Sequence, residues 1–172
     1  EGSSMRKVLA LLLVLGSASA TFGFDGNDSV RWKGIEGVVT ALSVDNPVGN
    51  VHAGTFPWTA RSGNARVNLS TGATAFRVDQ LVINGTIFSG TPGPVTGIIG
   101  TLVCNAGDPT ETVFDTPEVP LSSDGDARFS GHLGGVPTVC TNPLFLIRIS
   151  TPAGAHGFWI ATGTARTSNL GN

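Results

Sequence analysis

The alternation of apolar and polar residues in short runs most constrains the fold of this chain. No run has its apolar residues at helical spacing. Turn-forming Gly, Pro, Asn, Asp and Ser residues interrupt these runs about every 8–12 residues after the first twenty. Alternation places side chains on opposite faces of a strand, whereas a helix needs apolar residues three and four positions apart. The sequence therefore predicts an all-β domain of about ten strands.

Two neighbouring segments predict a hairpin with one polar face. Residues 65–69 place Ala65, Val67 and Leu69 on one face, and residues 73–78 place Arg77 opposite their apolar side chains. A second hairpin is expected around Asn84-Gly85, because this dipeptide favours a type I′ turn. Further strands are expected at 35–44, 48–58, 95–104, 111–114, 119–121, 127–133, 144–150 and 158–164.

The expected architecture is an antiparallel two-sheet sandwich, since each sheet must bury its apolar face. A partly closed β-barrel is the alternative. Residues 95–104 are apolar on both faces, so this strand should be central or covered on both sides. Gly97 and Gly100 within it suggest a bulge or a close approach of the backbone.

Charge is scarce in the sequence. Only 13% of the 172 residues are charged, about half the usual fraction. The net charge of -2 gives no overall basic footprint for a nucleic acid or an anionic membrane. We therefore expect no nucleic-acid partner.

The first twenty residues predict an export signal. Residues 1–4 read as the remnant of an expression tag before a natural start at Met5. A basic pair follows, then the apolar run 8–15 and the cleavage motif Ala18-Ser19-Ala20. Residues 5–20 would be the signal peptide, and residues 21–172 a single β domain.

The apolar run is too short to span a membrane, so no integral membrane span is expected after cleavage. No Cys follows it, which argues against a lipoprotein. The expected location is secreted, periplasmic or on the cell surface, with a signal peptide of bacterial type. In such an oxidising compartment, Cys104 and Cys140 are expected to pair as a disulfide.

No catalytic motif is recognisable, and the protein is predicted not to be an enzyme. A glycosidase would need two facing carboxylates. Four carboxylates in the second half of the chain could supply such a pair, but their setting favours solvated turns: Asp115, Glu118, Asp124 and Asp126.

Three histidines and two Asp-Gly segments are the candidates for a metal site. Three imidazoles, those of His52, His132 and His156, could bind copper or zinc if the fold brought them together. Their polar strand and loop settings favour isolated histidines. The Asp-Gly segments at 25–28 and 124–126 resemble calcium loops, but Asp-Gly is also ordinary turn chemistry. We therefore predict no metal and no cofactor.

Tryptophans offer a binding alternative. Trp58 beside Pro57 and Trp159 opposite Phe158 could be exposed and stack on sugar rings, as in carbohydrate-binding modules. Core filling is the commoner role for such residues.

Residues 95–164 resemble a recurring type of small secreted bacterial β-rich protein of unassigned function. The resemblance is carried by the segments 100–104, 116–121, 125–127, 140–148 and 159–163. It implies a β fold and the paired cysteines, and it transfers no activity.

Two function classes remain. The leading hypothesis is an exported non-enzymatic β domain acting as a structural, surface or assembly module, with self-association through sheet edges that few charges guard. The alternative is a module that binds a small ligand or a carbohydrate outside the cell through Trp58 and Trp159. A hydrolase or metalloprotein ranks below both.

Overall fold

A computed structural model describes residues 28–41, 44–135, 137, 139–151 and 156–170, and the side chains of His156 and residues 168–170 are not described. This part of the chain is all-β and contains no helix, as the sequence predicts. Nothing in it therefore has the length and apolar character of a membrane-spanning helix. The predicted signal peptide lies outside the described residues.

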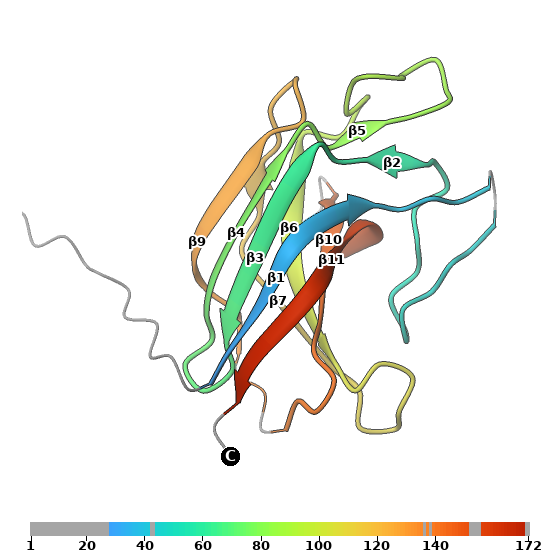
Figure 1. The fold of residues 1–172 in the computed structure, drawn as a ribbon. Coiled ribbons are helices and arrows are strands. Elements are labelled where there is room, and N and C mark those ends of the chain that lie inside the picture. The colour runs from blue at the N-terminus through green and yellow to red at the C-terminus, as the bar shows by residue number, and fades with distance from the viewer. Residues whose placement is uncertain (1–27, 42–43, 136, 138, 152–155, 171–172) are drawn as a thin grey trace, which may run out of the picture.

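Most strands belong to one antiparallel sheet with the order β7-β6-β10-β11-β1-β3-β4-β9, and β8 pairs with the free end of β6 (Figure 1). β2 and β5 form a small separate sheet. The bounds are β1 (Asp28–Gly37), β2 (Trp58–Thr59), β3 (Ser62–Asn68), β4 (Ala73–Asp79), β5 (Val82–Ile83), β6 (Gly97–Cys104), β7 (Thr112–Asp115), β8 (Val119–Pro120), β9 (Ala127–His132), β10 (Leu144–Ser150) and β11 (His156–Leu170).

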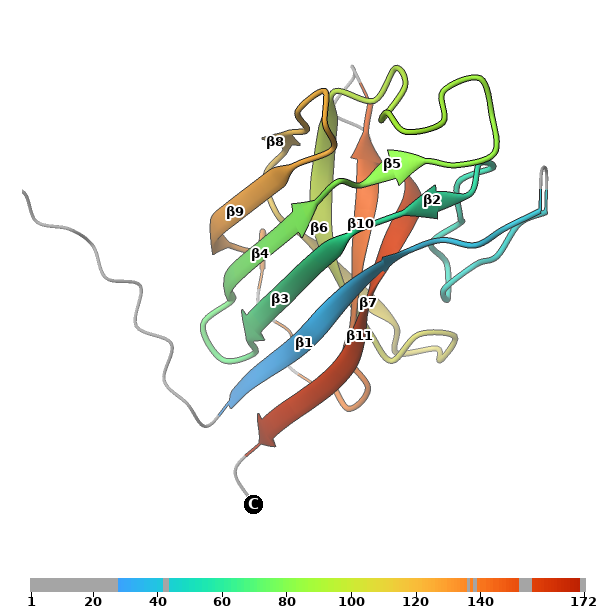
Figure 2. The same ribbon diagram turned by 45° about the horizontal axis from the view of Figure 1, so that its top comes forward.

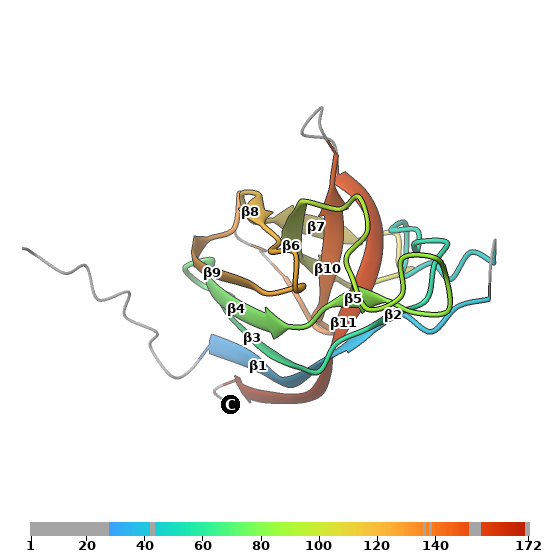
Figure 3. The same cartoon turned by 90° about the horizontal axis from the view of Figure 1, so that it is seen from above.

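The large sheet curls strongly into a half-barrel, which Figure 3 shows from above. β9, at one end of the strand order, comes into contact with β8 near the other end. The predicted two-sheet sandwich is not confirmed. Inward and outward side chains alternate in the same way in both architectures, so the sequence pattern cannot separate them.

An aromatic cluster fills the inside of the curl. Phe76 on β4 stacks against Phe129 on β9, with ring centroids 5.7 Å apart, and tilts against Phe145 on β10 at 5.6 Å. Trp32 on β1 meets Phe145 at 5.5 Å. A Cβ atom on Gly100 of β6 would lie 2.6 Å from the Phe76 ring, so only glycine fits there. Aromatic side chains thus join strands from both halves of the curl.

Several strand predictions are confirmed. β3 and β4 form the expected antiparallel hairpin, with Ala65 opposite Phe76. Every residue of β6 is buried, and the strand is central as expected, with β10 on one side and β7 and β8 on the other. The close approach expected at Gly97 and Gly100 involves side chains, those of Glu118 and Phe76.

Three strand predictions are wrong. Residues 48–58 form no continuous strand, because only isolated bridges occur before Trp58, the first residue of β2. Residues 86–88 form no strand, and only Gly85 of the Asn84-Gly85 pair has a positive φ (68°), so no type I′ hairpin forms. Val82–Ile83 pairs instead with Trp58–Thr59. The first strand runs over Asp28–Gly37 rather than 35–44, because its first half pairs with both β3 and β11.

Candidate functional site

The two tryptophans predicted to bind a ligand are buried. Trp58 is 2% exposed and Trp159 is 5% exposed. The Trp159 indole N–H donates to the Asn46 carbonyl (2.9 Å), and the backbone N–H of Gly54 donates to the Trp159 carbonyl (2.8 Å). The segment before β2 therefore covers Trp159. Stacking on a sugar needs an open ring face, so neither indole is placed to stack on one. Both rings fill the core, which is the commoner role for such residues.

The candidate carboxylates make structural contacts. Asp115 accepts a hydrogen bond from Thr101 and lies 3.6 Å from Arg148. Glu118 accepts one from the Ser150 hydroxyl.

In the 124–126 turn, the Asp126 carboxylate accepts the Gln80 N–H (2.9 Å). Glu118 and Asp126 line different hollows, and we therefore assign no catalytic pair.

The histidines do not gather at one site among the described side chains. His52 Nδ1 lies 2.5 Å from Asp45 Oδ2, and this hydrogen bond lowers the pKa of Asp45. His132 sits opposite Ala73 at the end of β9. In the described part of the chain, no three His, Cys, Asp or Glu residues are placed to hold a metal. The His156 side chain and residues 25–27 lie outside the described residues.

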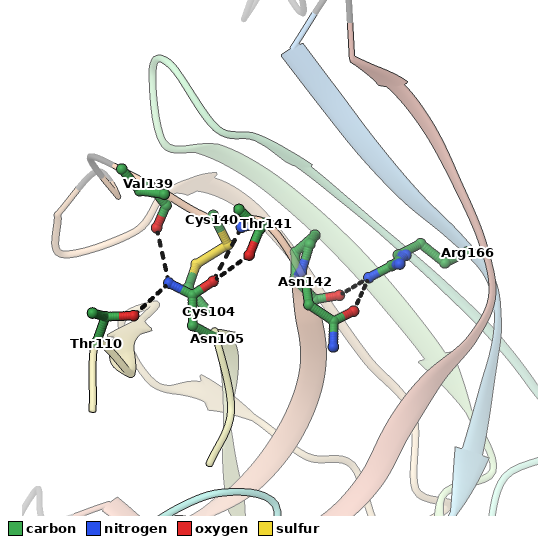
Figure 4. The surroundings of a disulfide bond; sticks show 9 residues. Cys104, Asn105, Thr110, Val139, Cys140, Thr141, Asn142 and Arg166 are labelled. Atoms are coloured by element: carbon green, nitrogen blue, oxygen red, sulfur yellow. Dashed lines mark hydrogen bonds between the residues drawn. A yellow bond between two sulfur atoms is a disulfide. The ribbon is translucent and has the colours of Figure 1, made fainter. Parts of the chain in front are cut away.

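The predicted disulfide is confirmed. Cys104 at the end of β6 is bonded to Cys140 in the loop before β10 (Figure 4). Beside it, the Asn105 side-chain amide accepts hydrogen bonds from the backbone N–H (3.1 Å) and hydroxyl (2.9 Å) of Thr141. The amide nitrogen donates to Thr110 (3.3 Å). The disulfide and Asn105 together hold the loop against the end of β6.

A cationic surface covers the outer side of β1, β3, β4 and β9, which lie side by side in Figure 2. Each of these strands carries an Arg between two side chains of the inner face. Neighbouring side chains on a strand point to opposite faces, so each Arg points away from the core. We call this surface the basic face and define it by Arg31, Lys33, Arg66, Arg77 and Arg128.

The basic face collects most of the cations. The chain has ten Lys and Arg residues, of which Arg6 and Lys7 lie outside the described residues, and five of the other eight are on this face. This face therefore holds most of the cations in the described part of the chain, although the whole chain is slightly acidic.

The strand register sets like charges directly opposite each other. Arg31 on β1 faces Arg66 on β3, and Arg77 on β4 faces Arg128 on β9. Directly opposed like charges in a sheet are unfavourable. Burial, followed by the charge of Arg31, lowers the pKa of the Arg66 guanidinium.

Two hollows lie between the cations. The first, of about 420 Å³, is lined by Arg31, Lys33 and Arg66, and the second, of about 520 Å³, by Arg77 and Arg128. Asn64 and Ala75 line both, so the two hollows adjoin at these residues. No carboxylate lines either hollow in the described part of the chain.

Among the described residues, the Asp79 carboxylate contacts a member of the basic face. Its carboxylate accepts hydrogen bonds from the Ser62 hydroxyl (2.7 Å) and from Arg77 Nε (2.8 Å). These two bonds, the Ser62 bond foremost, lower the pKa of Asp79. Asp79 therefore stays ionised and fixes the Arg77 guanidinium at the rim of the second hollow.

No protein-family model, curated protein or solved structure matches this chain. The resemblance of residues 95–164 to small secreted β-rich proteins accordingly stays a prediction.

Sequence reasoning missed the basic face because it relied on net charge. The signal was present in the strand pattern, where Arg66, Arg77 and Arg128 all occupy outward positions of strands predicted from alternation. Placing those strands next to one another required the sheet order, which alternation does not give.

Proposed function

We propose that this protein is an exported, non-enzymatic β domain that acts at the cell surface or outside the cell by binding an anionic ligand on its basic face. The observation that carries the proposal is the pairing of Arg31 with Arg66 and of Arg77 with Arg128 around two adjoining hollows. Four guanidinium groups that the register sets side by side, with Asp79 bonded to only one of them, Arg77, favour a bound anion.

The chemistry of the lining supports binding rather than catalysis. Arg presents five N–H donors in a planar fork that matches carboxylate, phosphate or sulfate groups, and it stays protonated in proteins. Asn64 between the cations adds an amide donor. These groups can orient an anion, but they supply no general base at neutral pH.

Export is supported by the disulfide. Disulfide bonds persist in oxidising compartments, so the Cys104–Cys140 bond agrees with the signal peptide read from residues 5–20. Self-association through sheet edges stays a prediction from the sequence. We favour a role as a surface module that holds an anionic component.

A titration with dextran sulfate tests the proposal. The wild-type protein should bind in isothermal titration calorimetry, and the variant R31E/R128E should lose binding at least about tenfold, because each charged hydrogen bond contributes roughly a factor of ten. Arg61 is an exposed cation that lines neither hollow, so R61E is the matched control. Absence of wild-type binding, or an equal loss in R61E, would refute the proposal.

A further inference from the structure

The placement of the cations specifies the kind of anion. We infer that the basic face binds an extended anionic polysaccharide, laid across β1, β3, β4 and β9 so that successive acidic groups meet the two Arg pairs in turn. This inference rests on the proposed function and names its ligand class.

The two Arg pairs are staggered. Arg31 and Arg66 are in register with Ala75 and Ser130. Arg77 and Arg128 form the next outward row of the sheet, two residues from Ala75 on β4 and from Ser130 on β9. With strands about 4.8 Å apart and about 3.4 Å per residue, the centres of the two pairs are about 10 Å apart across the sheet and about 7 Å apart along it. One small anion cannot reach both pairs, but a chain with repeated acidic groups can.

Small side chains keep the path between the pairs open. Ala75 and Asn64 form the part common to both hollows, and Ser130 continues it toward β9. Ala75 is only partly buried, so its methyl group forms an accessible floor. A polymer can therefore pass from one Arg pair to the other without meeting a large side chain.

The two hollows offer no fully exposed aromatic ring, which favours a polysaccharide over a single-stranded nucleic acid. The aromatic residues lining the hollows are Trp32, Phe76 and Phe129, and the first two are 2% and 3% exposed. Phe129 is stacked on Phe76. Single-stranded nucleic acids are usually held by bases stacked on exposed aromatic rings, which these hollows do not offer.

The length dependence of binding tests the inference. Sulfated dextran oligosaccharides from one to eight sugars would be titrated into the full protein, with inorganic sulfate and a single-stranded DNA of matched charge as comparisons. We expect affinity to rise steeply until both Arg pairs are engaged and then to level off. R31Q and R128Q should each lower the affinity of the longest oligosaccharide roughly tenfold, with R61Q unchanged.

A variant that leaves the charge unchanged distinguishes the contribution of the open path to binding from that of charge attraction. A75L fills the floor between the Arg pairs, so it should weaken the long oligosaccharide while leaving inorganic sulfate unaffected. The salt dependence of long-chain binding should decrease by about one counterion in R31Q and in R128Q.

The possible failures are distinguishable. Equal affinity for sulfate and for the octasaccharide, or an effect of only one Arg pair, would overturn the extended polysaccharide and leave anion binding intact. Tighter binding of the DNA would also overturn it. Binding of none of these anions would overturn the proposed function as well.

Discussion

Arg77 on β4 lies directly opposite Arg128 on β9, with no residue of opposite charge between them in the strand register. Arg31 and Arg66 repeat this relationship on β1 and β3. Such pairs lower the stability of a sheet, and functional sites commonly carry stability costs of this kind. Stability and anion binding should therefore respond in opposite directions when the charge of Arg31 or Arg128 is removed.

Neutralising Arg31 should stabilise the unliganded protein. R31Q removes the repulsion with Arg66, so we expect the free energy of unfolding at low salt to rise by about 0.5 kcal/mol. Urea denaturation at low ionic strength measures this change, which should disappear at about 1 M salt as the repulsion is screened. R61Q is the control and should have no effect. A loss of stability in R31Q would mean that Arg31 contributes favourable packing instead.

Acid should strengthen the binding of a sulfated ligand through Asp79. The pKa of Asp79 is lowered from its ordinary value of 3.8. The ionised carboxylate therefore contributes fully to stability above pH 3.8, and this contribution is lost as the pH falls through the lowered pKa. Over the same range, protonation releases Arg77 from its carboxylate partner. We expect affinity for dextran sulfate to increase roughly twofold from this group as the pH falls below about 4.

The variant D79N isolates this effect. It should bind dextran sulfate roughly twofold more tightly at neutral pH, because one opposing charge is gone. Its pH profile should then lack the part of the acid response that Asp79 causes. Identical pH profiles for D79N and the wild type would exclude a role for Asp79 in binding.

Gly100 should not accept even a methyl group. G100A places a Cβ atom 2.6 Å from the Phe76 ring and 3.0 Å from Phe145, and we expect a destabilisation of about 1–3 kcal/mol in thermal or urea unfolding. G134A is a matched control, since its Cβ would meet only the Asp115 carbonyl at 3.5 Å. The double variant G100A/F76L should lose less than the sum of the two single changes. Strict additivity would contradict the contact.

Reduction of the disulfide should weaken the fold without abolishing anion binding. Cys104 and Cys140 are 36 positions apart, and closing a loop of that length stabilises a protein by about 4 kcal/mol in the chain-entropy model. The variant C104A/C140A should therefore unfold at a lower temperature. Below that temperature it should still bind dextran sulfate, because the bond lies outside both hollows of the basic face. Loss of binding in the folded variant would place the disulfide loop in the site.

Sequence alternation predicted the strands whose two faces differ most clearly. β3, β4 and β9 each place apolar residues toward the core and Arg toward solvent, and their approximate extents could be read directly. The strand at Asp28–Gly37 was misplaced because its polar first half gains its order from the two strands that flank it. Asn84-Gly85 failed as a hairpin signal because tertiary pairing with β2 took the preceding residues.

The candidate site could be predicted only in part. Arg66, Arg77 and Arg128 were visible as outward residues, whereas Arg31 lay before the first predicted strand. Which strands are neighbours depends on pairings between distant segments, such as β4 with β9. The burial of Trp159 likewise depends on a loop that folds over from elsewhere in the sequence. The residue types indicated what the arginines and tryptophans could bind, but their positions in the fold depend on the sheet topology.

The aromatic filling of the curl has a consequence for how this domain can change its ligand. Phe76, Phe129 and Phe145 occupy the interior of the curl. A ligand of the basic face is therefore contacted by the outward residues of β1, β3, β4 and β9. Those positions can be exchanged without altering the packing beneath them. Along each of these strands, the inward residues maintain the scaffold. The outward residues that alternate with them are available to evolve a new specificity.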